Sequence, residues 1–136
     1  MDKASNRAQD RGQIRTLLGR LCRFHLWEPN SFGMHKAMTH EDALREHGPG
    51  IKRAYTYKAL NKLIQGSAAD MTKKAMLELY KEGIIPHIQI HDELDISVKD
   101  ESHAKKIIEV MENAVTLEVP NKVDYEHGDN WGEIHG

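Results

Sequence analysis

The most extended pattern in the chain is an apolar stripe at three- and four-residue steps, which predicts one long helix over residues 51–82. The stripe consists of Ile51, Tyr55, Leu60, Leu63, Ile64, Ala68, Met71, Ala75 and Leu79. Gly66 and Ser67 interrupt it, and there we expect either a bend or a close approach of another backbone. Gly83 follows the last turn and is expected to end the helix.

A second pattern, strict alternation of apolar and polar residues, covers residues 84–99 and predicts a β-hairpin with its turn within residues 91–95. The even-numbered positions are the apolar ones: Ile84, Ile88, Ile90, Leu94, Ile96 and Val98. Both strands can turn their even positions to one face only if the connecting loop has an odd number of residues or contains a bulge. We therefore expect such a loop rather than a two-residue turn.

Shorter signals predict the remaining elements. These are a helix over 1–11 ended by Gly12, strands over 13–18 and 21–27 around Gly19-Arg20, a loop over 28–33, helices over 40–47 and 100–114, a last strand over 122–125, and a tail over 128–136 anchored by Trp131. Together they predict an α+β fold in a single module over 1–136. A small antiparallel sheet, including the 84–99 hairpin, packs against a long helix and a second helix.

Composition fits this picture. The 136 residues are 39% hydrophobic and 29% charged, which is typical of a globular protein. The apolar runs are shorter than the roughly 20 residues that span a bilayer, and the chain opens without a secretory leader. Cys22 is the single cysteine, so an internal disulfide is excluded, a packing role is expected, and a cytoplasmic location (the host cytoplasm for a viral protein) is the default.

Charge is distributed unevenly along the chain. Residues 1–74 carry 14 basic and 7 acidic side chains, a net charge of +7, whereas residues 75–136 carry 5 and 14, a net charge of −9. This asymmetry favours a surface that faces a polyanion, although an alternation of basic and acidic helices would also produce it.

The chemistry is concentrated at His91-Asp92-Glu93, where the hairpin is expected to turn. Two adjacent carboxylates repel each other, and a divalent cation can neutralise them. Their hard oxygen ligands favour Mg²⁺ or Mn²⁺ over zinc, and two-metal phosphoryl transfer uses such carboxylates. Taken by itself, the tripeptide is a weak signal, and an acidic, solvated turn is then the favoured interpretation.

The sequence around the tripeptide resembles family A (Pol I-like) DNA polymerases, and it is most similar to that of bacteriophage members. Residues 61–76, Asn-Lys-Leu-Ile-Gln-Gly-Ser-Ala-Ala-Asp-Met-Thr-Lys-Lys-Ala-Met, are similar to the family's Asn-x-x-x-Gln-Gly-[Thr/Ser]-Ala-Ala-Asp helix, and 88–96, Ile-Gln-Ile-His-Asp-Glu-Leu-Asp-Ile, to its motif C hairpin. The resemblance extends to Arg15-Thr16-Leu17-Leu18-Gly19-Arg20, to Met111-Glu112 with Val119-Pro120, and to Asn130-Trp131.

The resemblance implies a carboxy-terminal palm with adjoining fingers elements. Its parts would be a fingers/palm connection over 1–50, a duplex-contacting helix over 51–82, the motif C hairpin over 84–99, and a terminal helix, strand and tail over 100–136. It implies that Asp92 binds the catalytic metals, Mg²⁺ or Mn²⁺, that Glu93 supports that metal site, and that His91 hydrogen-bonds near the primer terminus.

The resemblance also implies a contact between Asn61 and Gln65 and the minor groove of the template–primer. These residues lie four apart, on one face of a helix, and their amides can meet acceptors that every base pair offers. Lys58, Lys62, Arg20 and Arg23 are candidate phosphate contacts, and a solvated basic surface explains them nearly as well.

The sequence departs from the family pattern in two ways. Tyr57 stands where many members have an arginine, and Arg53 or Lys58 would have to supply that duplex contact. The other metal-binding aspartate (motif A) and the nucleotide-binding residues (motif B) precede the matched region and are not found in residues 1–60. We therefore expect the chain to be inactive alone, and to act on template–primer and dNTP with a second chain that carries motifs A and B.

Several interpretations remain open at this level. The chain is a subunit of a split polymerase or a piece of a longer one, a non-catalytic DNA-binding or assembly module, or an unrelated metal-dependent phosphodiester hydrolase. Surface that normally packs against the missing parts would be apolar, so self-association or partner binding is expected. His35, His40 and His47 are loosely spaced, which favours surface histidines over a zinc site.

Overall fold

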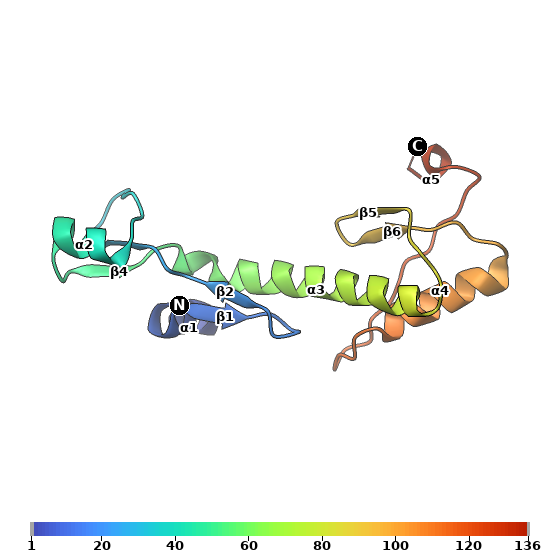
Figure 1. Ribbon diagram of the computed structural model, residues 1–136, viewed down its shortest axis with the longest axis horizontal. Coiled ribbons are helices and arrows are strands. Elements are labelled where there is room, and N and C mark those ends of the chain that lie inside the picture. The colour runs from blue at the N-terminus through green and yellow to red at the C-terminus, as the bar shows by residue number, and fades with distance from the viewer. Residues whose placement is uncertain (1, 136) are drawn as a thin grey trace. The chain divides into compact units, whose positions relative to one another are not determined.

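Helices alternate with three separate two-stranded antiparallel sheets in the computed structural model, which describes residues 2–135. This confirms the α+β class, with the single small sheet that was expected divided into three separate strand pairs. The chain forms two compact units, Met1–Asp70 and Met71–Gly136. The long helix α3 (Ala59–Lys81) begins in the first unit and ends in the second (Figure 1).

The first unit opens with the predicted helix and hairpin. Helix α1 (Lys3–Arg11) ends at Gly12, whose φ of 69° is the left-handed conformation that favours glycine. Strands β1 (Gln13–Arg15) and β2 (Leu21–Arg23) pair around Gly19-Arg20, which confirms the hairpin with shorter strands than expected. The core of this unit contains Ala8, Ile14, Phe24 and Ala59, and half-buried Cys22 packs against it as predicted.

Two predictions for the middle of this unit were wrong. Strand β3 (Trp27–Pro29) pairs antiparallel with β4 (Ile51–Arg53), so the expected 28–33 loop begins with strand residues and the expected 51–82 helix does not begin at 51. Tyr55 has a φ of 65°, which an α-helix does not accommodate. A short 3-10 helix, η1 (Thr56–Lys58), follows, and only then does α3 start. Between β3 and β4, helix α2 (His40–His47) confirms the prediction and ends at Gly48.

Helix α3 runs without interruption past Gly66, where the approach of a neighbouring segment accounts for the glycine. A Cβ added to Gly66 would lie 2.8 Å from Thr16 Cγ2. The Arg20 guanidinium donates from Nη2 to the Gly66 carbonyl at 3.1 Å, and the Leu17 amide donates to Ser67 Oγ at 2.9 Å. The close approach expected at Gly66-Ser67 is therefore made by the loop of the β1–β2 hairpin.

A buried carboxylate completes this junction. Asp70, on α3, accepts a short hydrogen bond from the Thr16 hydroxyl and a second from Arg20 Nε at 2.9 Å. The Thr16 hydrogen bond, and then the Arg20 hydrogen bond and charge, lower the pKa of Asp70 against the opposing effect of burial. We call Thr16, Arg20 and Asp70 the hairpin–helix clasp; it fixes the loop of the first hairpin to α3.

In the second unit, the hairpin exists as predicted but its register was predicted wrongly. Strands β5 (Ile88–Ile90) and β6 (Glu93–Asp95) pair with Ile90 opposite Glu93 and Ile88 opposite Asp95, which leaves a two-residue turn. Residues opposite each other share a face, so the apolar side chains of the two strands lie on different faces. Leu94 packs with Ile96 into the core formed by Leu79, Ile84 and Ile107, whereas Ile88 and Ile90 remain exposed.

The end of the chain follows the prediction in part. Helix α4 (Glu101–Asn113) starts at Asp100, whose carboxylate accepts from the His103 amide at 2.7 Å. Residues 122–125 form no strand, because the Val123 amide donates instead to Glu112 Oε1 of α4 at 2.9 Å. The tail is anchored as expected: Trp131 Nε1, at the start of α5 (Trp131–His135), donates to Asp95 Oδ2 at 2.8 Å. Among residues 2–135, no helix is both long and apolar enough to cross a bilayer.

Candidate functional site

The first candidate group lies at the tip of the β5–β6 hairpin, where His91 and Asp92 form the two-residue turn. His91 has a φ of 52°, the positive value that the first residue of the commonest hairpin turns requires. Its carbonyl accepts from the Gln89 side-chain amide at 2.7 Å, which fixes the strand end. Asp92 is exposed at the tip, and half-buried Glu93 begins β6. The turn therefore presents the Asp92 carboxylate at the outer end of the hairpin.

These two carboxylates suit a hard cation only as part of a larger ligand set. Mg²⁺ takes about six oxygen ligands at octahedral positions, and Asp92 and Glu93 supply carboxylate oxygens of that kind. Within residues 2–135, no group of three or more His, Cys, Asp or Glu side chains is arranged to hold a metal ion. The donors fit Mg²⁺ or Mn²⁺, and further ligands must come from water, phosphate groups or another polypeptide segment.

The second candidate group lies on the first turns of α3, in the other unit. Asn61 and Gln65 are both exposed, and their side-chain amides have no hydrogen-bond partner among the described residues. Lys58 directly precedes α3, and its Nζ lies 5.1 Å from the ring centroid of Tyr55 and 5.7 Å from that of Tyr57. The stretch therefore presents amide groups and a cation held by two aromatic rings.

The remaining predicted cations differ in what they already bind. Arg20 belongs to the hairpin–helix clasp, although half of its side chain is exposed. Arg23 is exposed at the end of β2 and forms no ion pair within residues 2–135. Arg53 lies over the Trp27 ring, 4.7 Å from its centroid, and donates to the Gln9 carbonyl at 2.6 Å. Arg53 is therefore committed to the fold, whereas Lys58 and Arg23 remain available to a ligand.

Sequence reasoning missed the role of Asp70. Both stretches that form the clasp, 15–20 and 61–76, stood out as family-like, but the sequence alone did not show that they bind each other. An aspartate that continues an otherwise apolar helical stripe was the available signal, because a buried carboxylate requires donors from another segment.

Comparison with known proteins shows that the chain is similar to DNA polymerases. The family model described as DNA polymerase family A matches residues 1–133. A DNA-directed DNA polymerase of Pseudomonas phage M6 is 37% identical over 130 residues, which cover 96% of this chain and 16% of the phage protein. DNA polymerase I of Borreliella burgdorferi is 41% identical over 86 residues, covering 57% of this chain and 10% of that protein.

A solved structure agrees with the sequence relatives. The polymerase domain of Pol1 from M. smegmatis, in complex with DNA primer-template and dNTP, matches with a TM-score of 0.66 and 27% identity. The match covers 98% of this chain and 22% of that chain. The chain thus spans only a small part of the length of the proteins that it resembles.

Proposed function

The chain belongs to DNA polymerase family A, and we propose that it is the carboxy-terminal part of a polymerase domain, acting in two-metal nucleotidyl transfer to a primer. In this role it supplies the motif C carboxylate and part of the template–primer surface. The single observation that carries the proposal is the exposed His91-Asp92 turn, which follows, in the family's order, a helix with exposed Asn61 and Gln65 amides. The wider assignment is a fingers/palm connection over 1–50 and palm elements beyond it.

At the hairpin, Asp92 would bind Mg²⁺ or Mn²⁺, Glu93 would support that site, and His91 would hydrogen-bond near the primer terminus. When bound, such metals stabilise the attacking and leaving oxygens of phosphoryl transfer. At its tip the hairpin offers the carboxylates of two adjacent residues, Asp92 and Glu93, so the remaining ligands are expected from a segment with motifs A and B. That segment is either the preceding part of the same polypeptide or a second chain.

On the duplex side, Asn61 and Gln65 would contact the minor groove. Their exposed amides, which have no partner among the described residues, support this role, because a groove contact then breaks no hydrogen bond within that part of the protein. Lys58, rather than Arg53, would supply the phosphate contact near Tyr57, since Arg53 is bound to Trp27 and Gln9. Arg23, which forms no ion pair among the described residues, would be a further phosphate contact, and Arg20 would contribute only with the part of its side chain that the clasp leaves exposed.

Exposed apolar residues of the second unit support a requirement for a partner. Ile85 is 65% exposed, and Leu77, Tyr80, Ile88 and Val119 are also exposed. Water-exposed apolar side chains of this number are typical of a surface that another polypeptide covers. The partner would be the remaining polymerase segment, and in its absence a second copy of this chain.

The experiment combines this chain with a second polypeptide that carries motifs A and B, followed by primer extension with Mg²⁺ and dNTP. We expect extension by the complex, none by this chain alone, and loss of extension for Asp92→Asn. Asp124→Asn, which neutralises an exposed carboxylate outside the hairpin, is the matched control and should extend normally. Extension that is equal for both variants would remove Asp92 from the site and refute the proposal.

A non-catalytic DNA-binding module is the second candidate. One observation favours it: Asn61, Gln65, Lys58 and Arg23, the groups proposed to contact DNA, are all exposed in the first unit, whereas the carboxylates at the hairpin tip form an incomplete ligand set. In that case Asn61→Ala and Gln65→Ala should weaken binding to duplex DNA, while Asp92→Asn changes no property of any complex that the chain forms.

A further inference from the structure

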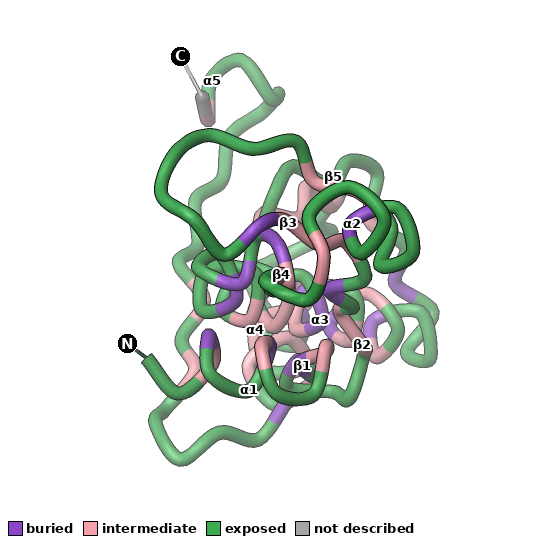
Figure 2. The backbone as a smooth tube through the Cα atoms, turned by 90° about the vertical axis from the view of Figure 1, so that its left-hand side faces the viewer, coloured by how far each residue is buried: buried purple, intermediate pink, exposed green. Residues whose placement is uncertain are grey.

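The loop between β3 and α2, residues 30–36, exposes two large apolar side chains to water. Phe32 is 106% exposed and Met34 is 102% exposed, the highest values among the large hydrophobic residues of the described chain. Residues 30–36 are exposed throughout, as the green tube in Figure 2 shows. Burial of either side chain within the protein would stabilise the fold. Because both instead lie in water, a ligand that covers them explains their position better than packing within the fold.

The loop is braced, so its tip projects from a fixed base. Trp27 and Met38 exchange two backbone hydrogen bonds, at 2.7 Å and 2.9 Å, and the Asn30 amide donates to the Gly50 carbonyl at 2.8 Å. Gly33, between the two apolar residues, has a φ of 126°, a backbone conformation that residues other than glycine rarely adopt. The backbone geometry therefore presents the residues on both sides of Gly33 outward.

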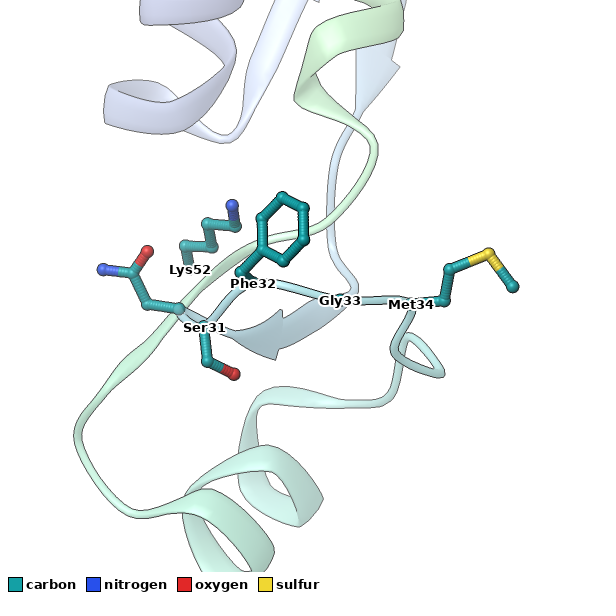
Figure 3. Close-up of a pocket in the computed structure, with 6 residues that line it drawn as sticks. Ser31, Phe32, Gly33, Met34 and Lys52 are labelled. Atoms are coloured by element: carbon teal, nitrogen blue, oxygen red, sulfur yellow. The ribbon is translucent and has the colours of Figure 1, made fainter.

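Figure 3 shows how the tip is arranged. The Phe32 ring and the Lys52 side chain project on the same side of the loop, while Met34 extends away from them. They line an open depression together with Asn30, Ser31 and Gly33. An aromatic face therefore lies beside a cation, with backbone and amide groups around both.

The charge around the tip is positive. Lys52 Nζ lies 3.9 Å from Glu28 Oε1, a long contact that leaves 44% of the lysine side chain exposed. Lys36 follows within the loop, and no acidic residue occurs between Glu28 and Glu41. An anionic ligand that reaches Lys52 would thus compete with Glu28 for the ammonium, and would meet no carboxylate from residues 29–40.

We propose that this loop binds single-stranded DNA, with Phe32 stacked on an unpaired base and Lys52 and Lys36 on the flanking phosphates. Aromatic rings beside cations hold unpaired strands in this way. Inside a duplex the faces of each base are covered by its neighbours, so one exposed ring selects unpaired bases. Met34 would contact the adjoining base or sugar. The inference rests on the proposed function, because a polymerase works beside an unpaired template strand.

The test measures fluorescence anisotropy of the full chain with labelled oligo(dT) and with a blunt duplex of equal length. Phe32→Ala should weaken oligo(dT) binding by about 5- to 150-fold, the range expected for one base–aromatic stack, and leave duplex binding unchanged. Phe32→Trp should retain affinity and add tryptophan quenching on binding. Lys52→Gln should reduce the salt dependence by about 0.7 in the log–log slope. Tyr125→Ala removes an exposed aromatic side chain of the second unit as the matched control.

Four results would overturn the inference. They are parental affinity of Phe32→Ala for oligo(dT), an equal loss with Tyr125→Ala, an equal loss on the duplex, or a chain that binds no oligo(dT). If the first of these results came with a change in the sedimentation of Phe32→Ala, the loop would be assigned to a contact with another protein instead of DNA. These outcomes are separate from the proposed function, which fails only if Asp92→Asn leaves primer extension by the complex intact.

Discussion

Replacement of Asp70 by asparagine should destabilise the first unit, because the carboxylate is the centre of the hairpin–helix clasp. Asp70 is 5% exposed and accepts hydrogen bonds from the Thr16 hydroxyl and from Arg20 Nε. A hydrogen bond to a charged group contributes about 1.5–3 kcal/mol. Asparagine can keep the Thr16 bond but loses the ion pair, whose other partner is half exposed and therefore screened. We expect the free energy of unfolding to fall by about 1.5 kcal/mol, the low end of that range, because the Arg20 partner is screened.

The loss should also depend on pH, with a sign that follows from the lowered pKa of Asp70. The hydrogen bond from Thr16 and the charge of Arg20 hold this pKa below the ordinary value of 3.8. The folded state therefore favours the carboxylate more than the unfolded state does, and the stabilisation is complete above the ordinary value. It is lost as the pH falls through the lower, folded-state pKa. The difference between the parent and Asp70→Asn should be full at neutral pH and shrink below about pH 4.

Urea unfolding, followed by circular dichroism and tryptophan fluorescence at several pH values, measures both effects. Asp124→Asn, an exposed carboxylate, is the control and should change stability by less than about 0.5 kcal/mol. A double-mutant cycle with Thr16→Val should show coupling, since the two side chains share a hydrogen bond. Two results would contradict this role of the clasp. One is an Asp70→Asn variant as stable as the control, and the other is a loss of unfolding free energy that stays the same in acid.

Three further predictions concern other parts of the chain. Gly66→Ala should destabilise the first unit by about 1–3 kcal/mol in urea unfolding, because its Cβ would lie 2.8 Å from Thr16 Cγ2, while Gly50→Ala, with open space around it, should not; equal stability of the two variants would contradict the close approach. Asp100→Ala should cost about 0.5–2 kcal/mol through loss of the α4 N-cap, measured by thermal unfolding, and an unchanged midpoint would show that the cap is dispensable. The isolated chain should self-associate in analytical ultracentrifugation and do so less with Ile85→Lys, whereas a monomer at all concentrations would argue against an uncovered apolar surface.

The candidate site was predictable to the extent that it depends on short stretches of sequence. Asn61 and Gln65 lie on one helix, and His91 and Asp92 form one turn, so motif spacing placed each pair correctly in its local element. The clasp was not predictable, because Thr16 and Asp70 are 54 residues apart and each looks unremarkable without the other. The same holds for Arg53, whose cation–π contact with Trp27 and hydrogen bond to Gln9 withdraw it from the candidate DNA contacts only in the folded chain.

The fold, like the candidate site, was predictable from the sequence only in part. The sequence by itself determined the family, the α+β class and the ends of several helices, because caps and left-handed glycines such as Gly12 act on their own turn. Tertiary structure decided that residues 51–53 are a strand, because their backbone groups bond to β3, which overrides a helical stripe. It also decided the register of the β5–β6 hairpin. Periodicity assigned Ile90 and Leu94 to one face, but in the fold only Leu94 packs against Leu79 and Ile107. The two-residue turn leaves Ile90 exposed beside the carboxylates. Helix and strand signals are local, whereas pairing and burial depend on residues that only the folded chain brings together.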